Sequence, residues 1–224
     1  MAVSSNAVFA VATTNTASVS NGERSAGRRF DREHGVTTQA ILFLDDLDPE
    51  FVGDAHAHAT HYEPIPVADF RALVSALPGE VVRTSTFIDV GAGMGRALLL
   101  ASTSPFKHII GIEVSPGLHQ VAKENLSQAR GITQLCRDLR VVRADARLWT
   151  YPPGDLVVFL YNPFDEIALA QCIGAIVHSR LPSDRVHLIY HTPVHESTLR
   201  SFGYDELARH PFGAVFRLHG SGQI

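Results

Sequence analysis

The chain has little cysteine, no excess of positive charge and no hydrophobic run long enough to cross a bilayer. Its 224 residues hold two cysteines, Cys136 and Cys172, without the C-x-x-C spacing of metal, redox or haem sites. Nineteen Lys and Arg against 23 Asp and Glu give a formal net charge of −4, so no global cationic field attracts nucleic acid or anionic lipid. The richest apolar stretches, 87–90 and 156–161, have strand length. These absences predict a soluble, cytoplasmic protein with no membrane partner and no extended nucleic-acid footprint, and they carry no sign of an oligomeric state.

The composition divides the chain into three segments. Residues 1–30 are rich in Ala, Ser, Thr and Asn, which predicts a disordered N-terminal tail. Residues 31–79 carry helical patterns at 38–47 and 67–77, on either side of a polar, His-rich stretch, and we expect a helical cap or lid there. Residues 80–224 are expected to form the main domain, because 45% of the chain is hydrophobic, enough for one sizeable core.

In the main domain, short apolar strands alternate with helical segments. This alternation is typical of an α/β fold, a three-layer, doubly wound and mostly parallel sheet with crossover helices on its faces. Near the end, His210 to Gly213 forms a turn signal inside the segment 204–219, which predicts a closing antiparallel hairpin. The expected strands are 86–90, 108–114, 139–143, 156–161 and 186–190, and the expected helices are 96–102, 116–129 and 166–179.

A glycine-rich loop follows the first of these strands. The run Asp89-Val90-Gly91-Ala92-Gly93-Met94-Gly95-Arg96 leads from a strand into a helix, so a small polar ligand can approach bare backbone at the helix N-terminus. The dinucleotide fingerprint G-x-G-x-x-G/A needs Gly or Ala where Arg96 stands, and no Walker Gly-Lys-Ser/Thr follows. The loop therefore favours a ligand without a pyrophosphate.

Two acids follow the next two strands. Glu113 lies about twenty residues beyond the glycines, where a carboxylate accepts both hydroxyls of a ribose. Asp145, followed by Ala146, comes after the third strand, where it can bind the amino group of a base; alone it would be an ordinary turn residue. Because parallel strands end at one edge of a sheet, the loop and both acids are expected to form a single site.

This combination resembles the class I S-adenosylmethionine-dependent methyltransferases over residues 80–220. The resemblance implies a Rossmann-like, seven-stranded sheet with an antiparallel final strand, and S-adenosylmethionine as cofactor. It places the methionine moiety on Asp89 and on the loop that contains Gly91, Ala92, Gly93 and Gly95. It places the ribose on Glu113, beside Val114, and the adenine on Asp145 and Ala146.

The segment Asn162-Pro163-Phe164 follows the fourth strand, where these enzymes carry a substrate-facing motif. It is similar to the Asp/Asn-Pro-Pro-Tyr/Phe motif of amino-methylating members with one proline missing, and to the Asn-containing motif of the non-SET histone-lysine methyltransferases. The resemblance implies that Asn162 and the Pro163 carbonyl orient a nitrogen while Phe164 covers it. It thus predicts methylation of an amine or amide on a protein or small-molecule acceptor; a proline-ended strand with a core phenylalanine is the simpler alternative.

The segments 30–38 and 63–66 resemble the N-terminal part of a small bacterial group of this superfamily. If these segments close over the cofactor, Tyr62 is the aromatic residue expected to lie against it. Two other classes of function stay open: an NAD(P)-dependent oxidoreductase, which Arg96 disfavours, and a noncatalytic cofactor-binding protein. No G-x-S-x-G motif of a Ser-His-Asp hydrolase is present.

Histidines provide the remaining candidates. His56, His58 and His61 have an H-x-H-x-x-H spacing similar to the metallo-β-lactamase ligand motif, but Thr60 replaces the Asp of that family, so no metal is predicted. His191 and His195 follow the fifth strand, where a substrate pocket can use a base.

Overall fold

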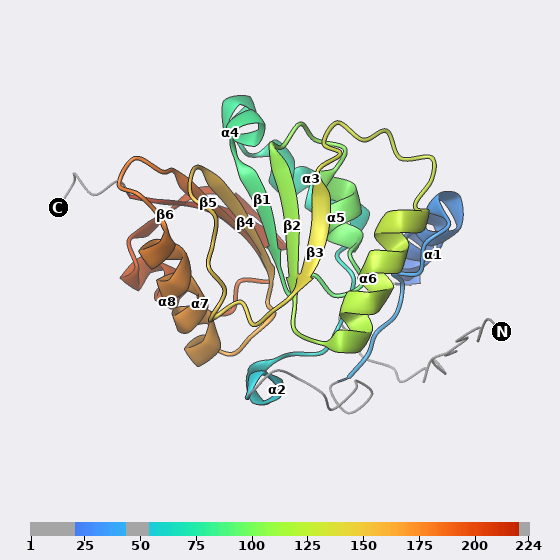
Figure 1. The fold of residues 1–224 in the computed structure, drawn as a ribbon, viewed down its shortest axis with the longest axis horizontal. Helices are drawn as coiled ribbons and strands as arrows, with labels where there is room; N and C mark the ends of the chain where they lie inside the picture. Colours follow the sequence, from blue (N-terminus) through green and yellow to red (C-terminus); the bar gives the residue numbers. More distant parts are fainter. Residues whose placement is uncertain (1–20, 44–53, 220–224) are drawn as a thin grey trace.

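The computed structural model describes residues 21–43 and 54–219, which form a seven-stranded sheet with helices on both faces (Figure 1). The strand order is β3-β2-β1-β4-β5-β7-β6, and β7 runs antiparallel to both of its neighbours. The predicted doubly wound sheet with an antiparallel final strand is therefore confirmed. The strands are β1 (Thr86–Val90), β2 (His108–Glu113), β3 (Leu139–Arg143), β4 (Leu156–Tyr161), β5 (Val186–His191), β6 (Tyr204–His210) and β7 (Gly213–Leu218).

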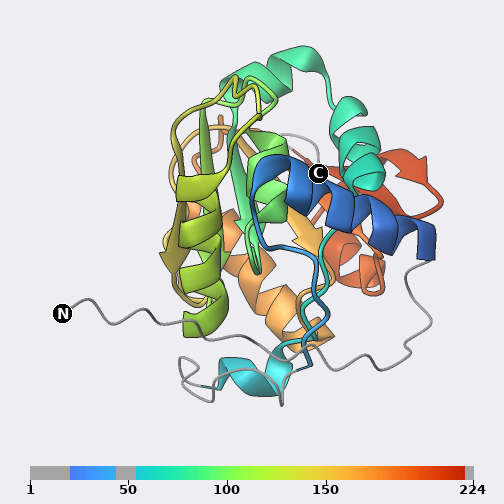
Figure 2. The same cartoon turned by 90° about the vertical axis from the view of Figure 1, so that its right-hand side faces the viewer.

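The helices form two layers. On one side of the sheet in Figure 1 lie α3, α5 and α6, and on the other lie α7 and α8. Figure 2, turned by 90°, shows α1 on the outside of the first layer. None of the helices within the described ranges is both long and apolar enough to cross a membrane. The helices are α1 (Asn21–His34), α2 (Ala55–His58), α3 (Val67–Ser75), α4 (Gly79–Thr84), α5 (Arg96–Ala101), α6 (Pro116–Gln128), α7 (Glu166–Ser179) and α8 (Glu196–Ser201).

Alternate residues of the central strands fill the two cores. Phe87 and Phe159 belong to the core on the α3 and α5 side, while Ile88 belongs to the core on the α7 side. Phe70 of α3 packs edge-on against the rings of Phe87 and Phe159, with centroids 5.9 and 5.4 Å away. This contact fixes α3, and with it the chain just before α3, against the carboxyl half of the sheet.

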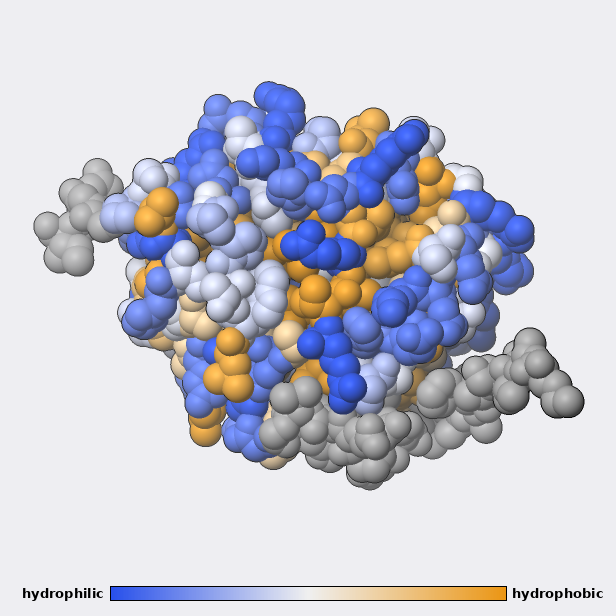
Figure 3. Space-filling model, viewed as in Figure 1, coloured by the Kyte–Doolittle hydropathy of each residue, from blue (hydrophilic) through white to orange (hydrophobic). Residues whose placement is uncertain are grey.

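The edge strand β3 is polar where it meets solvent. Arg140 and Arg143 are exposed, whereas Leu139 and Val141 are half-buried. Figure 3 shows an apolar area on this face that is interrupted by strongly hydrophilic side chains. Cationic side chains on an edge strand oppose pairing with another strand.

The N-terminal region differs from the sequence-based prediction. Helix α1 begins at Asn21, inside the segment expected to be disordered, and residues 1–20 lie outside the described residues. The helix predicted for 38–47 is wrong over the described residues 38–43, which are not helical; residues 44–47 lie outside the description. The Asp31 carboxylate explains the difference, because it accepts hydrogen bonds from the backbone N–H groups of Thr38 and Gln39, both at 2.7 Å. The chain then pairs Leu42 with Tyr62 instead of coiling.

The buried Arg96 connects α5 to this region. Its side chain is 3% exposed, donates to Thr38 Oγ1 at 2.7 Å and lies 3.3 Å from the Asp31 carboxylate. The guanidinium carbon also lies 5.5 Å from the centroid of the Phe30 ring. The residue that excludes the dinucleotide fingerprint thus holds α1 against the sheet.

We expect Arg96→Met to lower the free energy of unfolding by about 3 to 5 kcal/mol, because it leaves Asp31 and the backbone acceptors without their buried cation. Urea unfolding followed by circular dichroism measures this loss. The matched control is Arg140→Met on β3, whose side chain is 56% exposed and for which we expect a change of about 0.5 kcal/mol or less. Equal losses in the two variants would show that Arg96 does not anchor α1.

Candidate functional site

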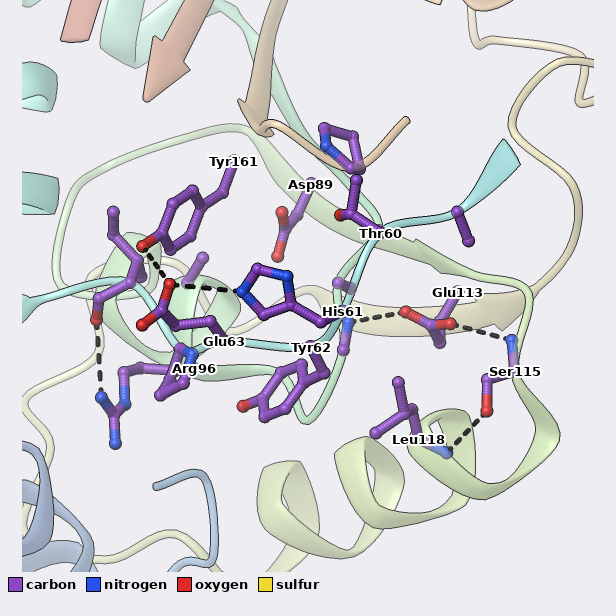
Figure 4. A pocket seen from close by; sticks show the side chains of 18 of the residues that line it. Thr60, His61, Tyr62, Glu63, Asp89, Arg96, Glu113, Ser115, Leu118 and Tyr161 are labelled. Carbon is purple, nitrogen blue, oxygen red and sulfur yellow. Dashed lines mark hydrogen bonds and ion pairs between the residues drawn. The ribbon is translucent and has the colours of Figure 1, made fainter. Parts of the chain in front are cut away.

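A pocket opens at the carboxyl ends of β1, β2 and β4 (Figure 4). Its floor is the glycine-rich loop after β1, and its cover is the extended segment 59–65 that leads into α3. Open α/β sheets bind ligands at this edge, near the point where the strand order reverses between β1 and β4. Of the residues expected to bind the cofactor, Tyr62, Asp89, Gly91, Ala92, Gly93, Glu113 and Val114 line this pocket.

The glycine loop has a backbone that other residues rarely adopt. Gly91, Gly93 and Gly95 have φ values of 75°, 53° and 84°. A Cβ atom on Gly93 would lie 2.2 Å from Cε2 of Tyr62, so the tyrosine ring rests directly on the loop. Gly95 does not line the pocket; it precedes α5 and faces Ala122 of α6, so its role here is helix packing.

Glu113 holds the loop and the end of β2 in place. One carboxylate oxygen accepts from the Gly93 N–H at 2.7 Å, and the other accepts from the Ser115 N–H at 2.8 Å. Ser115 in turn caps α6 by accepting from the Leu118 N–H. Burial raises the pKa of Glu113, although these backbone hydrogen bonds favour its charged form.

Asp89, the last acid of β1, is 2% exposed and lies in the same pocket. Burial, with a smaller contribution from the charge of Glu113, raises its pKa to about 8. The carboxyl group is therefore largely protonated at neutral pH when no cation lies beside it. A positively charged ligand would favour its ionised form.

The raised pKa of Asp89 makes stability depend on pH. The pKa of Asp89 is higher in the folded than in the unfolded protein. Below about pH 4 the acid is protonated in both states, so it does not lower the free energy of unfolding. As the pH rises from 4 toward 8, the free energy of unfolding falls by up to about 1.4 kcal/mol per pH unit. We expect Asp89→Asn to raise the melting temperature at pH 8 and to match the wild type near pH 4. Melting curves between pH 4 and 9 test this, and a wild type that is more stable than Asp89→Asn at pH 8 would contradict it.

Tyr62 is held rigidly above the loop. Its hydroxyl donates to the Thr38 carbonyl at 2.7 Å, and its backbone exchanges two hydrogen bonds with Leu42. Asn125 of α6 ties the same N-terminal segment to the loop, because its amide donates to the carbonyls of both Thr37 and Met94. The cover of the pocket is thus joined to its floor on two sides.

Asp145 and Ala146 line a smaller, adjoining pocket beside Val114 and Phe164. The Asp145 carboxylate accepts from Nε and Nη2 of Arg147, and Arg147 also donates to Asp54 at the start of the cover. Asp145 is therefore already paired with a cation, which the sequence did not predict. Most of the side chains that line this pocket are apolar, including Ile112, Val114 and Phe164.

The three residues expected to be catalytic are placed differently from one another. Pro163 and Phe164 line the main pocket, and Asn162 does not. Asn162 has φ 40°, and its side-chain oxygen accepts from the Tyr190 hydroxyl at 3.2 Å. Thr60 forms hydrogen bonds with the backbone carbonyls of Asn162 and Pro163. Its hydroxyl donates to the Asn162 carbonyl at 2.9 Å, and its N–H donates to the Pro163 carbonyl at 3.2 Å.

Three of the candidate histidines, His58, His61 and His191, are paired with acids. His58 lies 2.7 Å from Asp165, and His61 lies 3.7 Å from Glu63. Within the described residues, no group of three or more His, Cys, Asp or Glu is arranged to hold a metal ion; the side chain of His56 lies outside the description. His191 contacts Asp69 at 3.1 Å, and burial lowers its pKa.

Glu63 and Tyr161 meet in the pocket, and neither was predicted from the sequence as a site residue. The Tyr161 hydroxyl donates to a carboxylate oxygen of Glu63 at 3.0 Å. A signal for Tyr161 was present, because β4 pairs Phe159 with Asp89 and residues two apart on a strand share a face. Glu63 gave no such signal, since it lies in an extended segment whose position depends on the docking of α3.

The fold is that of class I methyltransferases. Two solved structures with this sheet are the glycopeptide N-methyltransferase MtfA complexed with sinefungin, at 12% identity over 69% of this chain and 87% of that one, and the [4+2]-cyclase SpnF, at 17% identity over 64% and 58%. Both have a TM-score of 0.50, and at these identities the likeness shows the fold alone.

In sequence, the chain is similar to a curated protein, the uncharacterized methyltransferase AN0656 of Emericella nidulans. The two are 34% identical over 110 residues, which is 48% of this chain and 36% of the relative, so the chain spans only about a third of the relative's length. No family model matches the chain. These comparisons support the resemblance that the motifs predicted.

Proposed function

We propose that this protein is an S-adenosylmethionine-dependent methyltransferase that transfers the methyl group to a nitrogen of a protein or small-molecule acceptor. The observation that carries the proposal is the glycine loop, which lines one pocket at the carboxyl edge of the sheet together with Glu113, the carboxylate that accepts from the Gly93 N–H. The similarity to a named methyltransferase supports the same activity.

The residues present fit this cofactor. The Tyr62 ring packs directly on Gly93, where any Cβ would collide with it, and the backbone of Gly91, Ala92 and Gly93 lines the pocket beside the ring, where a ligand can lie against it. Glu113 is placed to accept ribose hydroxyls, and the pocket beside Asp145 and Ala146 suits an adenine ring. Asp89, with a pKa of about 8, provides a carboxyl group that a cationic methionine moiety would ionise.

When bound, the sulfonium supplies a methyl group that a lone pair displaces in line. The protein then needs to hold the nucleophile close, to orient it and to exclude water. Pro163 and Phe164 line the pocket next to the start of the cover, where Ala59 pairs with Phe164, and the aromatic face of Phe164 can stabilise a cationic group. Asn162 remains a predicted catalytic residue by resemblance.

The alternatives make different predictions. The SpnF structure shows that a cyclase has this same fold, so the fold does not decide the reaction. An NAD(P)-dependent oxidoreductase would place a pyrophosphate where Arg96 anchors α1. A noncatalytic protein would bind the cofactor without turnover.

The test of the proposal is formation of S-adenosylhomocysteine from S-adenosylmethionine in the presence of mixed amine, amide, protein and phenol acceptors. We expect formation that depends on both acceptor and enzyme, with the methyl group found on nitrogen by mass spectrometry. Reduction of NAD or NADP in place of methyl transfer would refute the whole proposal. Methyl groups found only on oxygen would refute its nitrogen specificity.

A further inference from the structure

A buried carboxylate lies in the pocket at some distance from the predicted ribose site. In Figure 4, Glu113 and Ser115 lie on one side of the pocket, and Glu63 and Tyr161 lie on the other. The Glu63 side chain is 8% exposed and sits between the Tyr161 hydroxyl, at 3.0 Å, and Nε2 of His61, at 3.7 Å. Both contacts are made by the same carboxylate oxygen, Oε2, and they position the carboxylate in the pocket.

The charges of the pocket favour a cationic acceptor. Three acids line it, namely Glu63, Asp89 and Glu113. Apart from His61, Arg96 is the only basic residue among the described residues that line this pocket, and its guanidinium pairs with Asp31 behind the cover. Burial raises the pKa values of Asp89 and Glu113, and a cation in the pocket would favour their ionised forms, so the pocket favours a cationic ligand over an anion.

The contacts of the Asn162-Pro163-Phe164 segment also favour Glu63 as the group that binds the acceptor. The oxygen atoms that this motif would offer to a nitrogen already accept hydrogen bonds from Tyr190 and Thr60. Glu63 lies on the cover and lines the same pocket as Pro163 and Phe164. A carboxylate in this position can hold a protonated nitrogen by a charge-assisted hydrogen bond.

His61 gives this carboxylate a route to solvent. Its side chain is 43% exposed, whereas that of Glu63 is nearly buried. The hydrogen bond with Glu63 raises the pKa of His61, which favours its charged form beside the carboxylate, and its partly exposed ring can pass a proton to water.

We propose that Glu63, positioned by Tyr161, binds the acceptor and that the acceptor is a protonated primary or secondary amine. This inference rests on the proposed methyltransferase function and names the substrate class of the same site. The ammonium group gives one proton to Glu63, which passes it through His61 to water. The freed nitrogen lone pair forms the N–C bond as the C–S bond breaks, and the electron pair of that bond stays on sulfur as a neutral thioether. The product is a methylated ammonium ion.

The test compares Glu63→Gln with the wild type. The acceptors are a panel of primary and secondary amines beside carboxylic acids and phenols of matched size, and the readout is S-adenosylhomocysteine formed. We expect only the amines to accept methyl groups, and we expect Glu63→Gln to lower kcat/KM for them by about 100-fold, through KM because a charged hydrogen bond is lost and through kcat because glutamine cannot take the ammonium proton. Calorimetry is expected to give the same affinity for S-adenosylhomocysteine in both proteins.

Two more variants sharpen the comparison. Tyr161→Phe keeps the carboxylate and removes the hydrogen bond that positions it, so we expect a smaller rise in KM, about tenfold. Glu80→Gln is the control, because Glu80 is 67% exposed on α4, at the opposite end of the sheet, and pairs with Arg185. Its kinetic constants are expected to equal those of the wild type.

The outcomes separate the two proposals. If the wild type does not bind S-adenosylhomocysteine, the methyltransferase function and this inference both fail. If binding is intact but no amine is methylated, if Glu63→Gln also loses cofactor affinity, or if Asn162→Ala costs more kcat/KM than Glu63→Gln, then Glu63 is not the acceptor-binding residue. In those cases the proposed methyltransferase function still depends on the result of the S-adenosylhomocysteine formation assay with mixed acceptors.

Discussion

Gly93→Ala is expected to lower the affinity for S-adenosylmethionine by more than about 100-fold. The added Cβ would lie 2.2 Å from the ring of Tyr62, closer than any real contact, and the backbone φ of 53° already disfavours a side chain. Tyr62 cannot easily withdraw, because its hydroxyl and its backbone are both hydrogen bonded to the N-terminal segment. The substitution must therefore move the loop or the cover, and calorimetric titration measures the effect on binding.

The control for Gly93→Ala is Gly154→Ala. Gly154 also has a positive φ, 97°, but a Cβ atom there meets nothing within 4 Å. We expect this variant to lose about 1 kcal/mol of stability from backbone strain and to bind the cofactor normally. Equal binding losses in both variants would mean that strain, and not the contact with Tyr62, explains the result. The collision with Tyr62 is also expected to lower the stability of Gly93→Ala. Adding Tyr62→Ala to this variant should recover part of that lost stability, since the two residues are in contact.

Glu113→Gln is expected to have the second largest effect. Both oxygens of Glu113 accept backbone hydrogen bonds, from Gly93 and from Ser115, and a glutamine has only one such oxygen. Its NH₂ group would face an N–H donor, which disturbs the loop and leaves one donor without an acceptor. We expect cofactor affinity to fall by about 100-fold, the equivalent of one or two charge-assisted hydrogen bonds.

The matched control is Glu124→Gln on α6. Glu124 is exposed and accepts a hydrogen bond from Gln120 of the same helix, so we expect no change in affinity. Calorimetry with S-adenosylhomocysteine compares the two variants directly. An unchanged affinity in Glu113→Gln would exclude this residue from cofactor binding.

The sheet was predictable because its strands are short, apolar and separated by clear turn signals. The predicted bounds of β1, β3, β4 and α7 agree with the structure, and the turn at His210 to Gly213 correctly predicted the hairpin of β6 and β7. The small helix α4 before β1, and α8 after β5, were missed, since each has only six residues and too few turns to show a periodic pattern.

The cover of the site was not predictable in the same way, because it depends on contacts between distant residues. Asp31 holds Thr38 and Gln39 through its side chain, and Arg96 reaches Asp31 from a helix more than sixty residues away. The apolar spacing at 41–44 resembled a helix, but this tertiary network prevents one over the described residues. Arg96 was interpreted only as a mismatch to another motif, whereas in the structure it fixes the cover.

In the candidate site, too, the features encoded by local sequence were predicted and those that depend on tertiary contacts were not. The glycine loop and Glu113 were found from local sequence and meet in one pocket. Asp145 was found as well, but its pairing with Arg147 was not. Glu63 reaches the pocket only because Phe70 packs α3 against β1 and β4, a contact that no local pattern indicates.

The central claim is that the pocket beneath Tyr62 holds S-adenosylmethionine. Calorimetric titration of the purified protein with S-adenosylhomocysteine, with NAD and NADP in parallel, tests it most directly. We predict saturable binding of one S-adenosylhomocysteine per chain, abolished in Gly93→Ala and retained in Gly154→Ala, and no binding of either dinucleotide. Binding of NAD or NADP without binding of S-adenosylhomocysteine would contradict the account.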